Sequence, residues 1–101
     1  MNTLENKTIL ITGATDGLGR LLSINLAKLG ASLIIHGRSQ EKVDQSIAQL
    51  STKINGQKHT GIVCDFSDPE SIEKSFEDIK KIDIIINNAG EWQQGATAES
   101  N

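Results

Sequence analysis

Apolar residues fall into short uninterrupted runs, separated by longer segments in which they recur every three or four positions. Residues 9–11, 33–35 and 84–86 are Ile-Leu-Ile, Leu-Ile-Ile and Ile-Ile-Ile. A strand that is apolar on both sides is buried on both faces, as in a parallel sheet covered by helices. The pattern therefore predicts four strands, at residues 8–12, 32–36, 61–64 and 82–87.

Three helices are expected between these strands. The first, at residues 17–29, has a leucine stripe and stops at Gly30; the stripe consists of Leu18, Leu22, Leu26 and Leu29. The second follows Ser39, a suitable N-cap, and the third begins at Asp68-Pro69, where Asp can cap and Pro suits the first helical position. Their apolar faces are Val43, Ile47 and Leu50 in the second helix and Ile72, Phe76 and Ile79 in the third.

This alternation indicates βαβ units with right-handed crossovers, which place helices on both faces of a sheet. We expect an α/β chain with a partial Rossmann, doubly wound fold and the strand order 3-2-1-4. Residues 1–90 would form the N-terminal half of a nucleotide-binding domain. Residues 91–101 have little apolar content and would form a loop at a truncated end.

The turn after the first strand carries the strongest chemical signal. Residues 12–19 read Thr-Gly-Ala-Thr-Asp-Gly-Leu-Gly, and the expected helix starts within them. Glycines at these positions allow a sharp turn and a close approach to a pyrophosphate, which the N–H groups at the helix start attract. A Gly-rich turn with a purely structural role would show the same three glycines.

The spacing of this turn resembles the Thr-Gly-x-x-x-Gly-x-Gly fingerprint of the short-chain dehydrogenase/reductase family. Two further strand ends agree: Asn87-Asn88-Ala89-Gly90 resembles the family's Asn-Asn-Ala-Gly signature, and Asp65-Phe66 its Asp-hydrophobic pair. The resemblance covers residues 7–90. It implies that the Asn-Asn-Ala-Gly segment supports the sheet and lines the adenosine side of a nicotinamide dinucleotide, and that Asp65 holds the adenine amino group.

The end of the second strand bears on cofactor choice. Folds that prefer NAD usually have Asp or Glu here, whereas this chain has Gly37 followed by Arg38 and Ser39. Arg38 could fork onto a 2′-phosphate, with Ser39 adding a hydroxyl, or it could be a solvated side chain. We therefore expect NADP rather than NAD, and we expect Gly37→Asp to turn the preference toward NAD. Asp16 would either weaken phosphate binding or cap the helix.

The full set of expected dinucleotide contacts combines these segments. It consists of Gly13, Thr15, Asp16, Gly17, Leu18, Gly19, Arg38, Ser39, Asp65, Phe66, Asn88, Ala89 and Gly90.

Composition excludes several other classes of protein. The net charge is -3, and the chain has neither a basic run for nucleic acid nor the roughly 18 apolar residues of a membrane span, so a cytoplasmic location is expected. No Cys/His cluster has the spacing of a metal site. We expect Cys64, the single cysteine, to be a buried core residue, and we expect surface or hydrogen-bonding roles for His36 and His59. Trp92 could face a substrate or shield a sheet edge.

The family resemblance also implies residues that this chain does not have. Hydride transfer in the family uses a Tyr acid/base, a Lys four positions later and a Ser that orients the carbonyl, but the chain contains no tyrosine. No residue is therefore assigned a catalytic role, and the chain alone is expected to be inactive. Two explanations stay open: a truncated piece of an NADP-dependent oxidoreductase, whose relatives are often homo-oligomers, or a stand-alone nucleotide-binding or interaction module completed by a partner.

Overall fold

Four parallel strands form one sheet in the order β3-β2-β1-β4 in a computed structural model of the chain, which describes residues 3–52, 56–65 and 67–88. The strands are β1 (Thr8–Ile11), β2 (Ser32–Gly37), β3 (Thr60–Val63) and β4 (Ile84–Ile86). β1 pairs in parallel with both β2 and β4, and β2 pairs in parallel with β3. The expected strand order and direction are confirmed.

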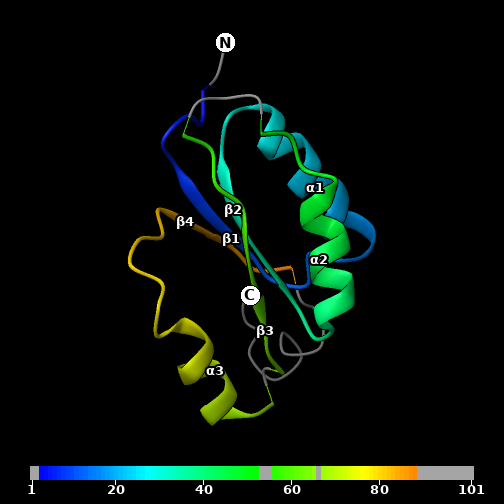
Figure 1. Ribbon diagram of the computed structural model, residues 1–101, viewed down its shortest axis with the longest axis vertical. Coiled ribbons are helices and arrows are strands. Elements are labelled where there is room, and N and C mark those ends of the chain that lie inside the picture. The colour runs from blue at the N-terminus through cyan, green and yellow to red at the C-terminus, as the bar shows by residue number, and fades with distance from the viewer. Residues whose placement is uncertain (1–2, 53–55, 66, 89–101) are drawn as a thin grey trace.

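Helices cover both faces of the sheet (Figure 1). The helices are α1 (Gly17–Lys28), α2 (Gln40–Ala48) and α3 (Pro69–Phe76). Ala27 of α1 and Val43 of α2 pack with alternate strand residues such as Ile9 and Leu33. The intervening strand residues, such as Leu10, face the other way, toward α3. The central strands β1 and β2 thus bury side chains on both faces, which is why their sequences do not alternate between apolar and polar residues.

The fourth strand is shorter than the segment predicted for it. It covers Ile84–Ile86 rather than residues 82–87, and the backbone bonds Asp83 N to Thr8 O (2.8 Å) and Thr12 N to Ile86 O (3.0 Å) mark its two ends. β4 pairs only with β1 among the described strands, through the pairs Ile9–Ile84, Leu10–Ile85 and Ile11–Ile86. The third strand begins one residue earlier than expected, and β2 extends through Gly37.

The leucine stripe expected for α1 is wrong in part. Leu18 is 71% exposed and Leu29 40% exposed, and the buried residues of the helix are instead Gly19, Ser23 and Ala27. Small side chains at positions four apart let the helix backbone approach the sheet closely, and the Ser23 hydroxyl is satisfied by donating to Gly19 O at 2.7 Å. Close approach therefore decides which face is buried, and side-chain hydrophobicity alone does not predict it.

The other two helices begin as expected. Ser39 caps α2 by accepting from Lys42 N at 3.4 Å, and Asp68 caps α3 by accepting from Glu70 N at 3.2 Å, with Pro69 in the first turn. Val43 is fully buried in α2. The apolar residues of α3, Ile72, Phe76 and the following Ile79, are only partly buried against the sheet.

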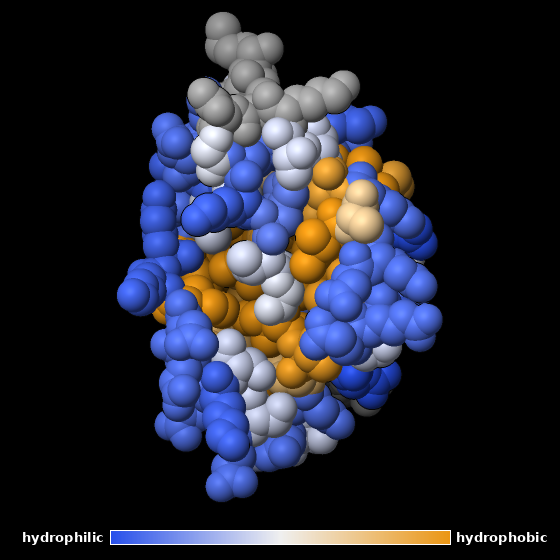
Figure 2. All heavy atoms as spheres, viewed as in Figure 1, coloured by the Kyte–Doolittle hydropathy of each residue, from blue (hydrophilic) through white to orange (hydrophobic). Residues whose placement is uncertain are grey.

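Apolar surface remains at the open side of the sheet. Ile84 is 40% exposed and Ile85 63% exposed on β4, which is the last strand of the described sheet on that side. Figure 2 shows apolar residues gathered across the middle of one face, framed by hydrophilic ones. Within the described ranges, no helix has the length and apolar character needed to cross a membrane.

Candidate functional site

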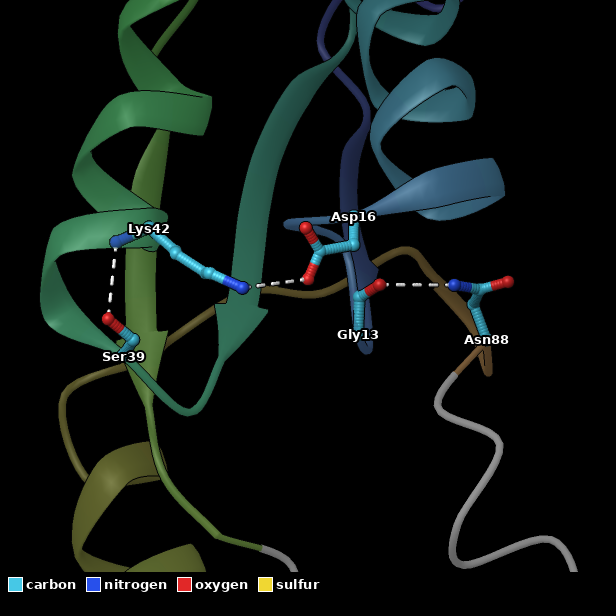
Figure 3. Close-up of polar contacts among 5 residues, drawn as sticks. All are labelled: Gly13, Asp16, Ser39, Lys42 and Asn88. Atoms are coloured by element: carbon cyan, nitrogen blue, oxygen red, sulfur yellow. Dashed lines mark hydrogen bonds and ion pairs between the residues drawn. The ribbon is translucent and has the colours of Figure 1, made fainter.

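The carboxyl ends of the strands bring the predicted binding segments together. The turn from β1 to α1, the turn from β2 to α2 and the end of β4 lie side by side in Figure 3, which draws residues from all three. The residues that follow β3 join the same edge, because Cys64 N donates to Gly37 O at 3.1 Å. Open parallel sheets bind ligands at this edge, so the sequence signals converge where a ligand is expected.

The turn between β1 and α1 needs glycine for two reasons: backbone conformation at Gly13 and Gly17, and lack of space at Gly19. Gly13 and Gly17 have φ angles of 60° and 54°, which glycine adopts without strain. Gly19 has no room for a side chain, because a Cβ there would lie 2.5 Å from Asn88 Nδ2 and 2.6 Å from Gly13 O. A Cβ at Gly17 would meet nothing within 4 Å, so the turn has open space at this residue.

Asn88 connects the end of β4 to the glycine turn. Its Nδ2 donates to Gly13 O at 3.1 Å, and its backbone N donates to Thr12 Oγ1 at 2.8 Å. Thr12 Oγ1 in turn donates to Asn87 Oδ1 at 3.2 Å. The two asparagines therefore brace the turn across 75 residues of sequence, and the described Asn88 contacts are to the turn itself.

The start of α1 has uncommitted hydrogen-bond donors. Asp16 occupies the N-cap position without a side-chain cap bond, and the first turn holds no acidic residue, in contrast to α2 and α3. Gly17 and Gly19 N–H have no hydrogen-bond partner among the described residues. Such N–H groups, together with the helix dipole, form an anion site. The residues present thus fit the pyrophosphate of a dinucleotide.

Asp16 does not cap α1; it pairs with a cation from the next helix. Lys42 Nζ lies 3.3 Å from Asp16 Oδ2, with both side chains largely exposed (Figure 3). An exposed pair of this kind stabilises the fold by at most about 1 kcal/mol. The pair also places the Lys42 ammonium beside the Asp16 carboxylate at the start of α1, so that the two opposite charges partly offset each other there.

Gly37, which is buried at the end of β2, has little room for a side chain. A Cβ on it would lie 2.7 Å from Thr15 Cγ2 and 2.9 Å from Val43 Cγ2. Both contacts are to β-branched side chains that have little rotameric freedom. The expected switch to NAD by Gly37→Asp therefore carries a steric cost that the sequence did not reveal. Arg38 follows on the surface, and Ser39 caps α2 while keeping its O–H available to donate.

Asp65 is an exposed carboxylate directly after the β3 end. Its Oδ1 accepts from both N and Oγ of Ser67 at 2.9 Å each. The pKa of the Asp65 carboxyl is lowered most by the hydrogen bond from the Ser67 backbone N, next by the one from the Ser67 hydroxyl, and also by the positive charge of Arg38. It is therefore ionised at neutral pH and lies in the electrostatic range of Arg38, which supports grouping the two at one site.

Cys64 behaves as the buried core residue that was expected. It is 4% exposed, and burial raises the pKa of its thiol, outweighing the hydrogen bond from Ser75 that lowers it. A neutral buried thiol is a poor nucleophile. Phe66, Ala89, Gly90 and Trp92 lie outside the described residues.

Two residues near the turn were not predicted as site residues. Lys42 sits in the first turn of α2, and a cation one turn after the Ser39 cap would have been the only sequence signal for it. His36 is 2% exposed, and its Nδ1 accepts from Gly13 N at 2.9 Å. The hydrogen-bonding role expected for His36 and His59 is confirmed, since both rings bridge backbone groups.

The arrangement suits an extended anionic ligand lying across the sheet edge. A separate pocket of about 370 Å³ lies at the opposite end, among the first residues of β1, β2 and β3, and takes no part in this site. No group of three or more metal-ligating side chains occurs within the described part of the chain. A glycine turn with uncapped donors at the carboxyl edge of a parallel sheet defines the class of Rossmann-type nucleotide-binding proteins.

Comparison with known proteins identifies the family. The family model for short chain dehydrogenases matches residues 7–101, and the chain belongs to that family. It is 37% identical over 87 residues to the uncharacterized oxidoreductase YvaG of Bacillus subtilis, covering 86% of this chain and 33% of that protein. It is also 37% identical over 91 residues to a 3-oxoacyl-(acyl-carrier-protein) reductase of Aquifex aeolicus, covering 86% and 36%.

Solved structures agree on the fold. A short chain dehydrogenase from Bacillus anthracis aligns with a TM-score of 0.72 at 33% identity, covering 82% of this chain and 34% of that one. A Pseudomonas aeruginosa complex of RhlG with NADP aligns with a TM-score of 0.74 at 25% identity, covering 88% and 36%. The chain thus spans about a third of the length of the proteins it matches.

Proposed function

We propose that the chain is the NADP-binding part of a short-chain oxidoreductase that transfers hydride between NADP(H) and a carbonyl or alcohol substrate. The observation that carries the proposal is the glycine turn, whose helix-start donors lack a side-chain cap and lie beside Lys42. The bound dinucleotide would supply the hydride, and the residues described here would hold and orient it. A cytoplasmic location is part of the proposal.

The pyrophosphate would lie over the first turn of α1. Gly17 leaves space on the outer side of the turn, and Gly19 lets the helix start lie against Gly13 and Asn88. Leu18, 71% exposed beside these glycines, would contact the ligand with its apolar side chain. Thr15, next to Gly37, would line the path toward the adenosine.

The adenosine end would be held by residues after β2 and β3. Asp65 Oδ2 has no hydrogen-bond partner among the described residues, so it can accept from the adenine amino group. The Arg38 guanidinium would bind the 2′-phosphate through two N–H groups, and the O–H of Ser39 would donate to the same phosphate. Lys42 adds a second cation near this phosphate and neutralises Asp16. Phe66, Ala89 and Gly90 remain proposed contacts from the family resemblance.

A second candidate is a nucleotide-binding or interaction module without catalysis of its own. The observation that favours it is the exposed Ile84 and Ile85 on β4, which leave an edge that another polypeptide could cover. The two candidates differ in whether the protein to which the chain belongs oxidises NADPH with a carbonyl substrate. We expect no NADPH oxidation with carbonyl substrates by the 101-residue chain, because it has no tyrosine phenol to act as proton donor.

Calorimetric titration of NADP and NAD tests the proposal. A charge-assisted hydrogen bond to the 2′-phosphate is worth roughly 1.5–3 kcal/mol, which is about ten- to a hundredfold in affinity. We expect tighter binding of NADP in this range, and loss of most of the preference in Arg38→Ala. Lys42→Ala should weaken NADP more than NAD, because Asp16 is then left unpaired beside the phosphate.

Lys58→Ala is the matched control, because it removes an exposed lysine at the amino end of the sheet. It should leave the ratio of the two affinities unchanged. Equal affinities for NADP and NAD in the wild type, or an unchanged ratio in Arg38→Ala, would reject the NADP assignment. Failure of both nucleotides to bind would reject nucleotide binding by this chain.

A further inference from the structure

We propose that His36 is a positioning residue that makes nucleotide affinity depend on its protonation state, so that the site weakens as the pH falls. This inference rests on the nucleotide binding proposed above. His36 is the penultimate residue of β2, its side chain is 2% exposed, and it lies beneath the glycine turn. A buried imidazole in contact with a ligand-binding turn is in a position to regulate that turn.

The contacts of the ring determine its tautomer. Gly13 N lies 2.9 Å from Nδ1, and a backbone N–H can only donate, so Nδ1 must be unprotonated. Cys64 O lies 3.0 Å from Nε2, and a carbonyl can only accept, so Nε2 must carry the hydrogen. Only the neutral ring with its hydrogen on Nε2 satisfies both contacts at once.

The ring joins two segments of the proposed binding site. Gly13 belongs to the glycine turn, and Cys64 immediately precedes Asp65, the proposed adenine contact. The main chain of His36 adds a third contact, because its carbonyl accepts from Ala14 N at 2.9 Å. Through these three contacts, His36 fixes the position of the glycine turn relative to the ends of β2 and β3.

Protonation would break this arrangement at one definite atom. An imidazolium has a hydrogen on Nδ1, which would face the Gly13 N–H as a second donor. The turn would have to move away, and Gly13 O would then lose its alignment with Asn88 Nδ2. The donors at the start of α1 would be displaced with the turn, which weakens the cradle for the pyrophosphate.

Among the described residues, ionisable groups on the segments that adjoin His36 come from three places. The end of β3 contributes Cys64, whose thiol is neutral, and the exposed Asp65. The β2–α2 turn contributes the exposed Arg38, and the glycine turn contributes Asp16, which forms an ion pair with Lys42. From α3, the contact with the end of β3 is through the uncharged Ser75.

The test compares His36→Asn with the wild type. Asn Oδ1 can take the place of Nδ1 and accept from Gly13 N–H, but Asn has no counterpart of Nε2 to contact Cys64 O, and it does not titrate. The variant should therefore bind NADPH more tightly than His36→Ala at pH 8, and it should lose the part of the pH dependence that comes from residue 36. The ratio of wild-type to variant affinity should fall between pH 8 and pH 5.5, by at most about tenfold per pH unit for one proton. Using the ratio removes the titration of the 2′-phosphate itself, which is common to both proteins.

His59→Asn is the matched control. His59 makes the same kind of bridge at the other end of the sheet, with Leu33 N at 3.1 Å from Nδ1 and Ser51 O at 2.7 Å from Nε2. Replacing it should change stability but leave the wild-type pH profile of NADPH affinity in place. His36→Ala, which has no acceptor for Gly13, should bind roughly two- to tenfold more weakly at pH 8.

The outcomes separate this inference from the proposed function. No binding of nucleotide at any pH would reject the proposed function, and with it any role of His36 in affinity. Binding with the same pH profile in the wild type and His36→Asn would reject only the inference. Nitrogen NMR of the His36 ring gives a readout without nucleotide: a neutral ring with its hydrogen on Nε2 is expected at pH 7.5, and the opposite tautomer would overturn the argument.

Discussion

Replacing Gly37 with Asp should destabilise the fold before it alters cofactor choice. The new Cβ would lie 2.7 Å from Thr15 Cγ2 and 2.9 Å from Val43 Cγ2, and neither β-branched side chain can rotate away easily. Overpacking at a buried position of this kind typically costs about 1–3 kcal/mol of unfolding free energy. We expect Gly37→Asp to lose an amount in this range.

A second substitution should restore part of that loss. Thr15→Ser removes the closer of the two methyl groups and keeps the hydroxyl, so it relieves one contact and leaves the one with Val43. The double variant should therefore recover roughly half of the cost, about 0.5–1.5 kcal/mol. Thr15→Ser alone should stay within about 1 kcal/mol of the wild type. The preference for NAD should emerge only in the double variant, where the introduced carboxylate can approach the ribose.

Urea unfolding of the four proteins measures this coupling as a double-mutant cycle. The m-values should stay constant, and the costs of the two substitutions should not add. Calorimetry with NAD and NADP then gives the cofactor preference of each protein. A Gly37→Asp variant as stable as the wild type, or strictly additive costs, would refute the steric reasoning.

Three further changes test other parts of the structure. Gly19→Ala should lower the unfolding free energy by about 1–3 kcal/mol, because the new methyl group would displace Asn88. This loss should outweigh the better helix propensity of Ala. A variant that is more stable than the wild type in urea unfolding would contradict this expectation. Asp83 Oδ2 accepts from Thr8 N at 2.8 Å, and this hydrogen bond lowers the pKa of the Asp83 carboxyl. The ionised carboxylate therefore stabilises the fold fully above the unfolded pKa of about 4. This stabilisation is lost as the pH falls through the lowered pKa of the folded state. Asp83→Asn should therefore reduce the change in unfolding midpoint on acidification, and an unchanged acid profile would exclude this role. Ile85→Lys should reduce self-association in sedimentation experiments, since Ile85 is 63% exposed on the last described strand, and equal association of the two proteins would rule out this edge as the cause.

The framework of the fold could be predicted from the sequence because it depends on local patterns. Short apolar segments identified the four strands, and Ser39 and Asp68 identified two helix starts, which the structure confirms. The strand order followed from the topology that βαβ units adopt. The strand boundaries depend on the neighbouring strand as well. β4 covers Ile84–Ile86 rather than the predicted residues 82–87, because only these three residues pair with β1.

Only the tertiary structure decided how the site is assembled. Lys42 meets Asp16 across 26 residues of sequence, Gly13 meets His36 across 23 and Asn88 across 75. Hydrophobic periodicity says which face of a segment is buried, but it carries no information about which atoms of two distant turns come within hydrogen-bonding distance. The buried face of α1 shows the same limit, since Gly19, Ser23 and Ala27 face the sheet only because close backbone approach outweighs the burial of larger leucines.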